Sequence, residues 1–216
     1  METPESQFKR ALNPWFSIWI KPRETMKEIF ISKPKNGFLL ILLGLLVQVL
    51  DRAAFKSIAD SISSPFLLIL VVILSTFIGA LIYYFLIPAL LNWVARKLGG
   101  QGTFEKTRYA TAYSYIPFVY SLILVWVPSF FLFGIENFTS ETPKMDSSIT
   151  LTILFLIFAI IDFVIGIWTI IISLKCLGEA HQFSAWKALL TTIVSILIII
   201  LPLVIIVILI AVVITL

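Results

Sequence analysis

The chain has 216 residues, of which 60% are hydrophobic and 13% charged, and its mean hydropathy is +1.05. Soluble domains average about 45–50% apolar and about 25% charged residues. The composition therefore indicates a membrane protein and excludes a water-soluble enzyme fold. One cysteine and one histidine exclude an internal disulfide and a structural zinc site with four protein ligands. The net charge of +4 does not imply nucleic acid binding.

Residues 1–35 form a polar arm that contains seven Lys or Arg and lacks the apolar core and cleavage site of a signal peptide. Its segment 14–20 is rich in aromatic residues, and a helix is predicted to begin at Pro22. Met26, Ile29 and Phe30 recur at helical spacing, which predicts an amphipathic helix on the cytoplasmic leaflet. Either anionic head groups or a protein partner could hold this arm.

Five charge-poor runs are long enough to cross about 30 Å of hydrocarbon. They are residues 36–55, 65–91, 113–134, 149–173 and 188–216. The fold class predicted is an all-α, polytopic five-helix transmembrane bundle, with residues 1–35 as the arm and 36–216 as the membrane domain. Thirteen Lys and Arg lie on the side of the arm and only Arg52, Lys56 and Lys144 on the other. The positive-inside rule then predicts a cytoplasmic N-terminus, and five spans place the C-terminus on the extracellular side. We expect the chain to lie in the plasma membrane.

Asp162 lies near the middle of the fourth span, where an acidic residue costs about 2.5–3.5 kcal/mol on insertion scales. It must therefore face protein or water and be hydrogen-bonded or protonated. Depth matching selects its candidate partners, which are Ser75, Thr76, Tyr120 and Ser121. Two interpretations stay open, a proton or cation site and a neutral acid that links three helices.

Asp51 and Arg52 end the first span, close enough to the outer interface for Arg52 to reach water. Adjacent helical residues point about 100° apart, so each needs another partner, and Asp60 across the outer loop is the candidate for Arg52. Arg52→Ala is expected to impair assembly or partner association, unless Arg52 only reaches the head groups.

The 98–104 segment is rich in glycine but lacks the terminal Lys-Ser/Thr of a phosphate loop. It predicts a tight turn with glycines at positive φ and Thr103 as the cap of the next helix. Tyr113 marks a membrane boundary, and Pro117 is expected to kink the third span.

The 175–186 segment does not offer the combination of a nucleophile, a base and an orienting acid, and no intramembrane protease motif occurs in the sequence. We expect no enzyme, cofactor or metal site.

The order of these parts resembles the bacterial branch of the Yip family, the Ypt/Rab-interacting five-span membrane proteins. The resemblance covers residues 14 to about 200 and includes the Leu50-Asp51-Arg52-Ala53 end of the first span and the 178–188 loop. Its other motif residues are Pro14, Trp15, Trp19, Pro22, Arg23, Arg96, Gly99, Gly100, Gly102, Phe104, Tyr113 and Pro117.

The resemblance implies a non-enzymatic adaptor. Eukaryotic members bind prenylated GTPases, whereas bacterial members lack Rab partners and are sometimes associated with ABC-type exporters. This chain lacks the long polar N-terminal region of the eukaryotic members. We therefore expect an adaptor that joins a membrane transport complex or organises lipids. Its expected partners are anionic lipid, another membrane protein complex or a second copy of the chain. The alternative is a small transporter or ion pathway centred on Asp162.

Overall fold

The computed structural model describes residues 12–62 and 64–215, and these residues form helices and connecting loops without strands. Five helical stretches are long and apolar enough to cross a membrane, which confirms the predicted all-α five-helix class. They are Gly37–Phe55, Pro65–Lys97, Phe104–Phe138, Ile149–Ala180 and Ala185–Ala211.

The arm folds into two short helices, α1 (Pro14–Ile20) and α2 (Pro22–Ser32). Proline stands at the first position of each helix, where its missing N–H leaves no hydrogen bond unmade. Met26 and Ile29 of α2 are completely buried in the same core cluster as residues of the bundle. The apolar side of the predicted amphipathic helix therefore packs on protein, while Phe16, Ile20 and Ile31 of the arm face outward.

The first two spans are α3 (Gly37–Phe55) and a stretch that consists of α5 (Pro65–Leu81), a π-helical turn η2 (Ile82–Leu86) and α6 (Ile87–Lys97). The short helix α4 (Ile58–Ser61) connects them. Pro88 is the second residue after the π-helical turn. Because proline can neither donate a hydrogen bond nor fit against the carbonyl one turn earlier, a locally widened turn keeps this span continuous.

The third span is interrupted between α7 (Phe104–Tyr113) and α8 (Ile116–Ser121), just before Pro117. It continues through a second π-helical turn, η3 (Leu122–Trp126), into α9 (Val127–Phe133) and the 3₁₀ turn η4 (Gly134–Phe138). The helix break lies where Pro117 was expected to distort the span.

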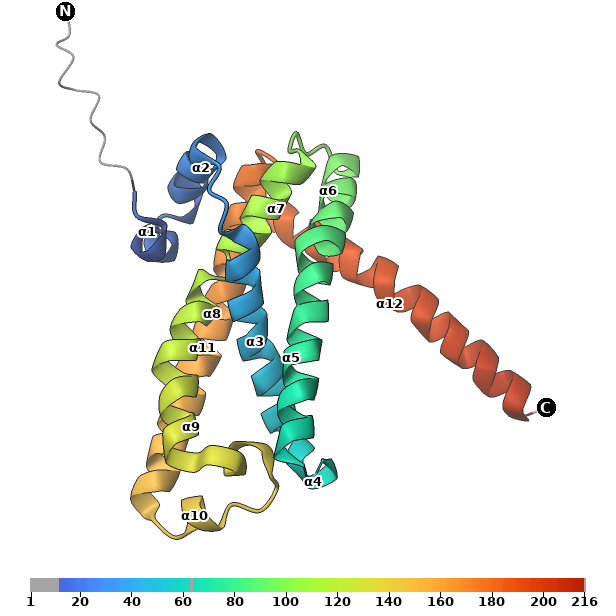
Figure 1. Cartoon of the computed structure of the whole chain (residues 1–216). Coiled ribbons are helices and arrows are strands. Elements are labelled where there is room, and N and C mark those ends of the chain that lie inside the picture. Colours follow the sequence, from blue (N-terminus) through green and yellow to red (C-terminus); the bar gives the residue numbers. More distant parts are fainter. Residues whose placement is uncertain (1–11, 63, 216) are drawn as a thin grey trace, which may run out of the picture.

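The last two spans are α11 (Ile149–Ala180), which follows the short α10 (Pro143–Asp146), and α12 (Ala185–Thr215). Figure 1 shows α3, α5, α8, α9 and α11 running side by side, while α12 leaves the bundle at an angle. We call the end of the bundle formed by α2 and residues 98–103 and 181–184 the basic end. The opposite end carries α4, η4 and α10 (Figure 1).

Candidate functional site

At the basic end, Arg23 of α2 reaches across to the end of α11 and the loop that follows it. Its Nη1 atom lies 3.3 Å from Glu179 Oε2, and its Nη2 atom donates a hydrogen bond of 2.8 Å to the carbonyl oxygen of Phe183. The Glu179 side chain is only 6% exposed, so this ion pair is largely desolvated on its acidic side. A charged pair with additional hydrogen bonds holds its geometry far better than a surface pair.

Gly178 makes room for this contact. A Cβ atom at position 178 would lie 2.7 Å from Arg23 Nη2 and 3.0 Å from the carbonyl oxygen of Phe183. Real Cβ atoms do not approach so closely, and a glycine is therefore required beneath the guanidinium group.

His181 lies beside this ion pair and joins α11 to the glycine-rich loop. Its side chain is buried, its Nδ1 atom accepts a hydrogen bond of 3.2 Å from the Gly102 N–H, and its Nε2 atom is 2.8 Å from Thr107 Oγ1. Thr107 already donates its hydroxyl proton to the Thr103 carbonyl oxygen. These bonds assign the neutral tautomer with the proton on Nε2. Burial and, to a lesser degree, the charge of Arg96 lower the pKa of His181 to about 4, which keeps the ring neutral at physiological pH.

The glycine-rich loop fits closely over the imidazole ring. A Cβ atom at Gly100 would lie 2.7 Å from His181 Nδ1, and one at Gly102 would lie 2.6 Å from both His181 Nδ1 and the Ala180 carbonyl oxygen. Only Gly99 has the positive φ expected of this turn, at +82°. Gly100 and Gly102 are thus explained by close packing on His181 rather than by backbone conformation. The expected cap is present, because Thr103 Oγ1 accepts a hydrogen bond from the Lys106 N–H.

We call this set of contacts the clasp. It joins the arm, the 98–103 loop and the 181–184 loop, and its residues are Arg23, Gly100, Gly102, Thr107, Gly178, Glu179, His181 and Phe183. Arg23, Gly100 and Gly102 belong to the predicted motif. The sequence patterns gave no role to His181 or Glu179. The one signal they offered is that the only histidine of the chain stands two residues after a glutamate, next to an apolar span.

Aromatic motif residues fasten α1 to the bundle. Trp15 and Trp19 pack edge-on against Tyr120 at ring distances of 6.2 and 5.4 Å, and Tyr120 Oη donates to the Trp15 carbonyl oxygen. Trp168 of α11 donates its indole N–H to the Trp19 carbonyl oxygen at 3.1 Å. Tyr120 therefore binds the arm and not Asp162.

Other motif residues mark helix ends near the clasp. Tyr113 closes α7 and hydrogen-bonds through its hydroxyl to Asn36 Oδ1 before α3. Phe104 opens the same helix, and the Arg108 guanidinium lies 5.4 Å from its ring. The first contact ties the start of α3 to the end of α7, and the second lies within α7.

Within the bundle, two carboxyl groups lie together. Asp162 accepts a hydrogen bond from Ser121 Oγ, as predicted, and Asp51 accepts one of 2.9 Å from Trp126 Nε1. The Asp51 and Asp162 side chains are close enough to interact with each other, and both line a cavity of about 280 Å³. The sequence alone suggested only hydroxyl side chains as partners of Asp162 and did not pair it with Asp51.

The remaining predicted polar residues lie elsewhere. Thr76 donates its hydroxyl to the Val72 carbonyl oxygen, and Ser75 lines a groove of about 730 Å³ with Asp51 and Arg52. Asp60 accepts hydrogen bonds from the Ser140 N–H at 3.1 and 3.2 Å. None of the ion pairs among the described residues involves Arg52. The expected contacts of Ser75 and Thr76 with Asp162, and of Arg52 with Asp60, are therefore not formed.

The described residues also contain no group of three or more His, Cys, Asp or Glu side chains placed to hold a metal ion.

Comparison with known proteins agrees with this arrangement of parts. A family model described as the Yip1 domain matches residues 16–213. No match was found among curated proteins or among solved structures. The matched region includes α2, all of the clasp and the five membrane-spanning stretches, and the chain belongs to the Yip1 domain family of membrane proteins.

Proposed function

We propose that the chain is a non-enzymatic membrane adaptor that binds another membrane protein complex through its basic end. The main observation that supports this proposal is the clasp. It fixes the arm and two loops that are distant in sequence into one surface, so that the groups on that surface keep constant positions. Rigid presentation lowers the entropy cost of binding, which is what a docking surface requires.

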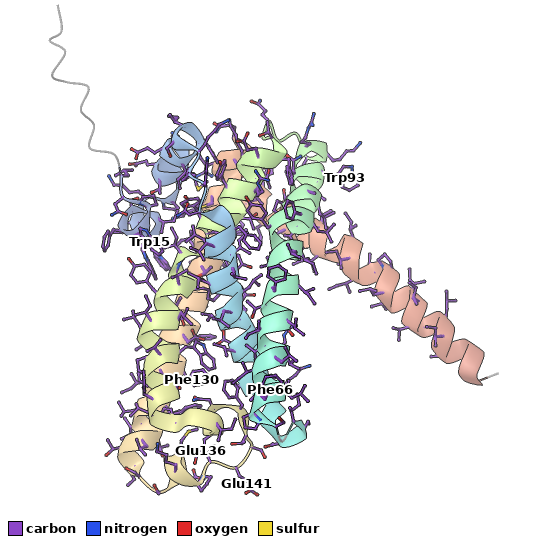
Figure 2. The ribbon with its side chains drawn as sticks, viewed as in Figure 1. Trp15, Phe66, Trp93, Phe130, Glu136 and Glu141 are labelled. Atoms are coloured by element: carbon purple, nitrogen blue, oxygen red, sulfur yellow. The ribbon has the colours of Figure 1, made fainter. Side chains whose placement is uncertain are left out.

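The surface around the clasp has the composition expected of such a docking surface. It is rich in exposed cations and has large aromatic residues at its edge. Trp93 and Trp186 are 54% and 80% exposed, and Figure 2 shows Trp93 near the basic end. The exposed cations are Lys27, Lys33, Lys35, Arg96, Lys97, Lys106 and Lys175. Tryptophan and arginine are enriched where protein interfaces are strongest, and clustered cations also bind anionic head groups.

The same charge distribution supports a cytoplasmic basic end in a plasma membrane. The extracellular side would then hold α4, η4 and α10, and α12 would end outside. A membrane transport complex is the partner we propose, with an ABC-type exporter as the first candidate, in keeping with the resemblance to bacterial Yip proteins.

Affinity purification from a mild detergent extract tests this proposal. A membrane complex should co-purify stoichiometrically with the wild-type chain and be lost from Arg23→Gln, which breaks the clasp. Lys21→Gln is the matched control, because Lys21 is exposed and pairs only with its neighbour Glu24 at 3.6 Å. A wild-type chain that reproducibly elutes without a protein partner contradicts the proposal, and so does undiminished recovery of the complex with Arg23→Gln.

A second candidate function rests on the carboxyl pair. Two carboxyl groups that face each other in a membrane can share one proton or accept a cation, and intramembrane acids commonly mark such pathways. Asp51 also lines the large groove that contains Ser75 and Arg52, which supports access to the pair from that side.

Flux measurements in proteoliposomes test this second candidate. A transport function predicts pH-driven or substrate-driven flux that Asp162→Asn and Asp51→Asn each abolish, while Asp60→Asn, on the connecting helix α4 and bonded to Ser140, leaves it intact. Absence of flux in the wild-type chain, or flux unchanged in both variants, would assign Asp51 and Asp162 to helix packing alone.

A further inference from the structure

A cavity of about 240 Å³ lies where α12 diverges from the rest of the bundle, close to the basic end. It is bounded by η2, α6, α7, α11 and the first part of α12. Beyond it, α12 leans away in Figure 1, and the large side chains of residues 196–210 are exposed. The cavity thus lies at the base of the part of α12 whose side chains are exposed.

Hydroxyl groups line the inner side of the cavity. Five of them come from Thr111, Ser114, Ser173, Thr192 and Ser195. Each donates its proton to a carbonyl oxygen three or four residues earlier in its own helix, at distances between 2.8 and 3.0 Å. A hydroxyl that donates in this way keeps its lone pairs, so these groups present acceptors to a ligand and no free donor.

A tyrosine pair closes the polar side of the cavity. Tyr83 and Tyr115 both line it, pack edge-on at a ring distance of 5.9 Å, and interact through their hydroxyls, with Gln48 as a further partner of Tyr115. Tyr83 belongs to the π-helical turn η2, and such widened turns recur at functional sites.

The charge and the size of the cavity restrict the ligand further. Its lining contains no Asp, Glu, Lys or Arg, so a charged head group would be buried without a counter-charge. Its volume is below the range of about 300–1,000 Å³ that is typical of sites for drug-sized molecules. The outer rim is formed by apolar side chains of α6 and α12, among them Ile87, Leu90, Ile196 and Ile199.

We propose that this cavity binds the uncharged hydroxyl head group of a membrane lipid, of the diacylglycerol type, with the acyl chains lying against the apolar side chains of α6 and α12. The lipid hydroxyl donates to the acceptors that the serine and threonine hydroxyls present. A phosphate head group fits less well, because it brings negative charge to a lining that contains no Lys or Arg. Neither the clasp nor the carboxyl pair takes part.

The test uses the full-length chain in nanodiscs with two photoactivatable probes. One is a diacylglycerol with a diazirine in one acyl chain, and the other is a phosphatidic acid with identical chains. The diacylglycerol should label peptides that contain residues 87–91 or 196–199, and unlabelled diacylglycerol should compete for this labelling. Equal labelling by both probes in the wild-type chain, or labelling spread evenly over the membrane surface, overturns the proposal and leaves water or bulk acyl chains as the occupant.

Variants that remove single hydroxyl groups from the lining test whether these groups bind the lipid hydroxyl. Thr192→Val removes a hydroxyl while keeping the shape of the side chain, and labelling should fall about fivefold for each hydrogen bond lost. Thr192→Ser should retain it. Thr76→Val is the matched control, because Thr76 is a buried threonine that also bonds its own helix but does not line this cavity. Unchanged labelling in Thr192→Val and Ser114→Ala, each with a wild-type melting temperature, also overturns the proposal.

Discussion

The imidazole of His181 and the backbone of Gly102 are in direct contact, with no space between them for a side chain at position 102. The Gly102 N–H donates to His181 Nδ1 at 3.2 Å, while a Cβ atom at position 102 would lie only 2.6 Å from the same nitrogen. The contact joins residues 79 positions apart in the sequence. It therefore stabilises the association of two spans through a hydrogen bond that only a glycine can make here.

We expect Gly102→Ala to lower the free energy of unfolding by about 1–3 kcal/mol, the usual cost of forcing an extra methyl group into a packed site. Gly100→Ala should act in the same direction, because its added methyl would meet His181 and the Ala95 carbonyl oxygen. Thermal unfolding in detergent micelles measures both effects. Gly166→Ala is the control, since a Cβ atom there meets nothing within 4 Å. Equal melting temperatures for Gly102→Ala and Gly166→Ala would show that the loop relaxes freely.

Arg23→Gln should release the arm without unfolding the bundle. The substitution leaves Glu179 buried and without its counter-charge, which is costly enough for α2 to detach part of the time. Hydrogen exchange measured by mass spectrometry should show faster exchange in residues 22–32, with residues 37–55 unchanged. Lys21→Gln should exchange like wild type. If residues 22–32 exchange as slowly in Arg23→Gln as in the wild type, the packing of Met26 and Ile29 is sufficient to hold the arm in place.

His181 should make stability depend on pH in a defined window. Its pKa is about 4 in the folded protein, against an ordinary value of 6.5, so between these values the unfolded chain binds a proton that the folded chain does not. The contribution of neutral His181 to the free energy of unfolding is therefore fully present above about pH 6.5 and is lost progressively as the pH falls toward 4. Melting temperatures measured across this range should decline less steeply in His181→Gln. Parallel curves for the two proteins would mean that other groups cause the decline.

Reporter fusions after residues 101 and 216 test the proposed orientation. Residue 101 lies at the basic end, and residue 216 follows the last span, so the two reporters should give opposite signals. The first should report the cytoplasm. Signals from the same side would contradict five crossings and would point to the first span, which has only 15 uncharged residues between Asn36 and Leu50.

Arg52→Ala is expected to change stability by less than about 0.5 kcal/mol, because Arg52 is exposed and its side chain makes no ion pair among the described residues. An effect on partner recovery without an effect on the melting temperature would place Arg52 at a binding surface. A lowered melting temperature would instead show that Arg52 supports the end of α3.

The sequence was sufficient to predict the elements that local chemistry determines. Hydropathy located the five apolar helices, and the Thr103 cap and the break before Pro117 followed from side-chain hydrogen bonding and from the geometry of proline. The motif residues identified the family, which the family model confirms. Each of these features depends on residues close together in the chain.

The contacts between helices were harder to predict. The length of the first span indicates how far Asp51 lies from its end, but the contact of Asp51 with Asp162 depends on how α3 and α11 are placed against each other. The pattern of Met26 and Ile29 is the same whether a helix covers lipid or protein. His181 stands alone in the sequence, and no spacing pattern could reveal that two loops would meet on its ring.

The clasp also has a consequence for the order of events during synthesis. Arg23 and the Phe183 carbonyl oxygen are 160 residues apart, and the arm is made first. During translation α2 can reach α7 after the third span is made, but its contacts with α11 and residue 183 form only after the fourth. Part of the buried face of α2 therefore stays uncovered until late in synthesis, and closure of the clasp marks the moment at which the nascent protein first acquires its complete basic end.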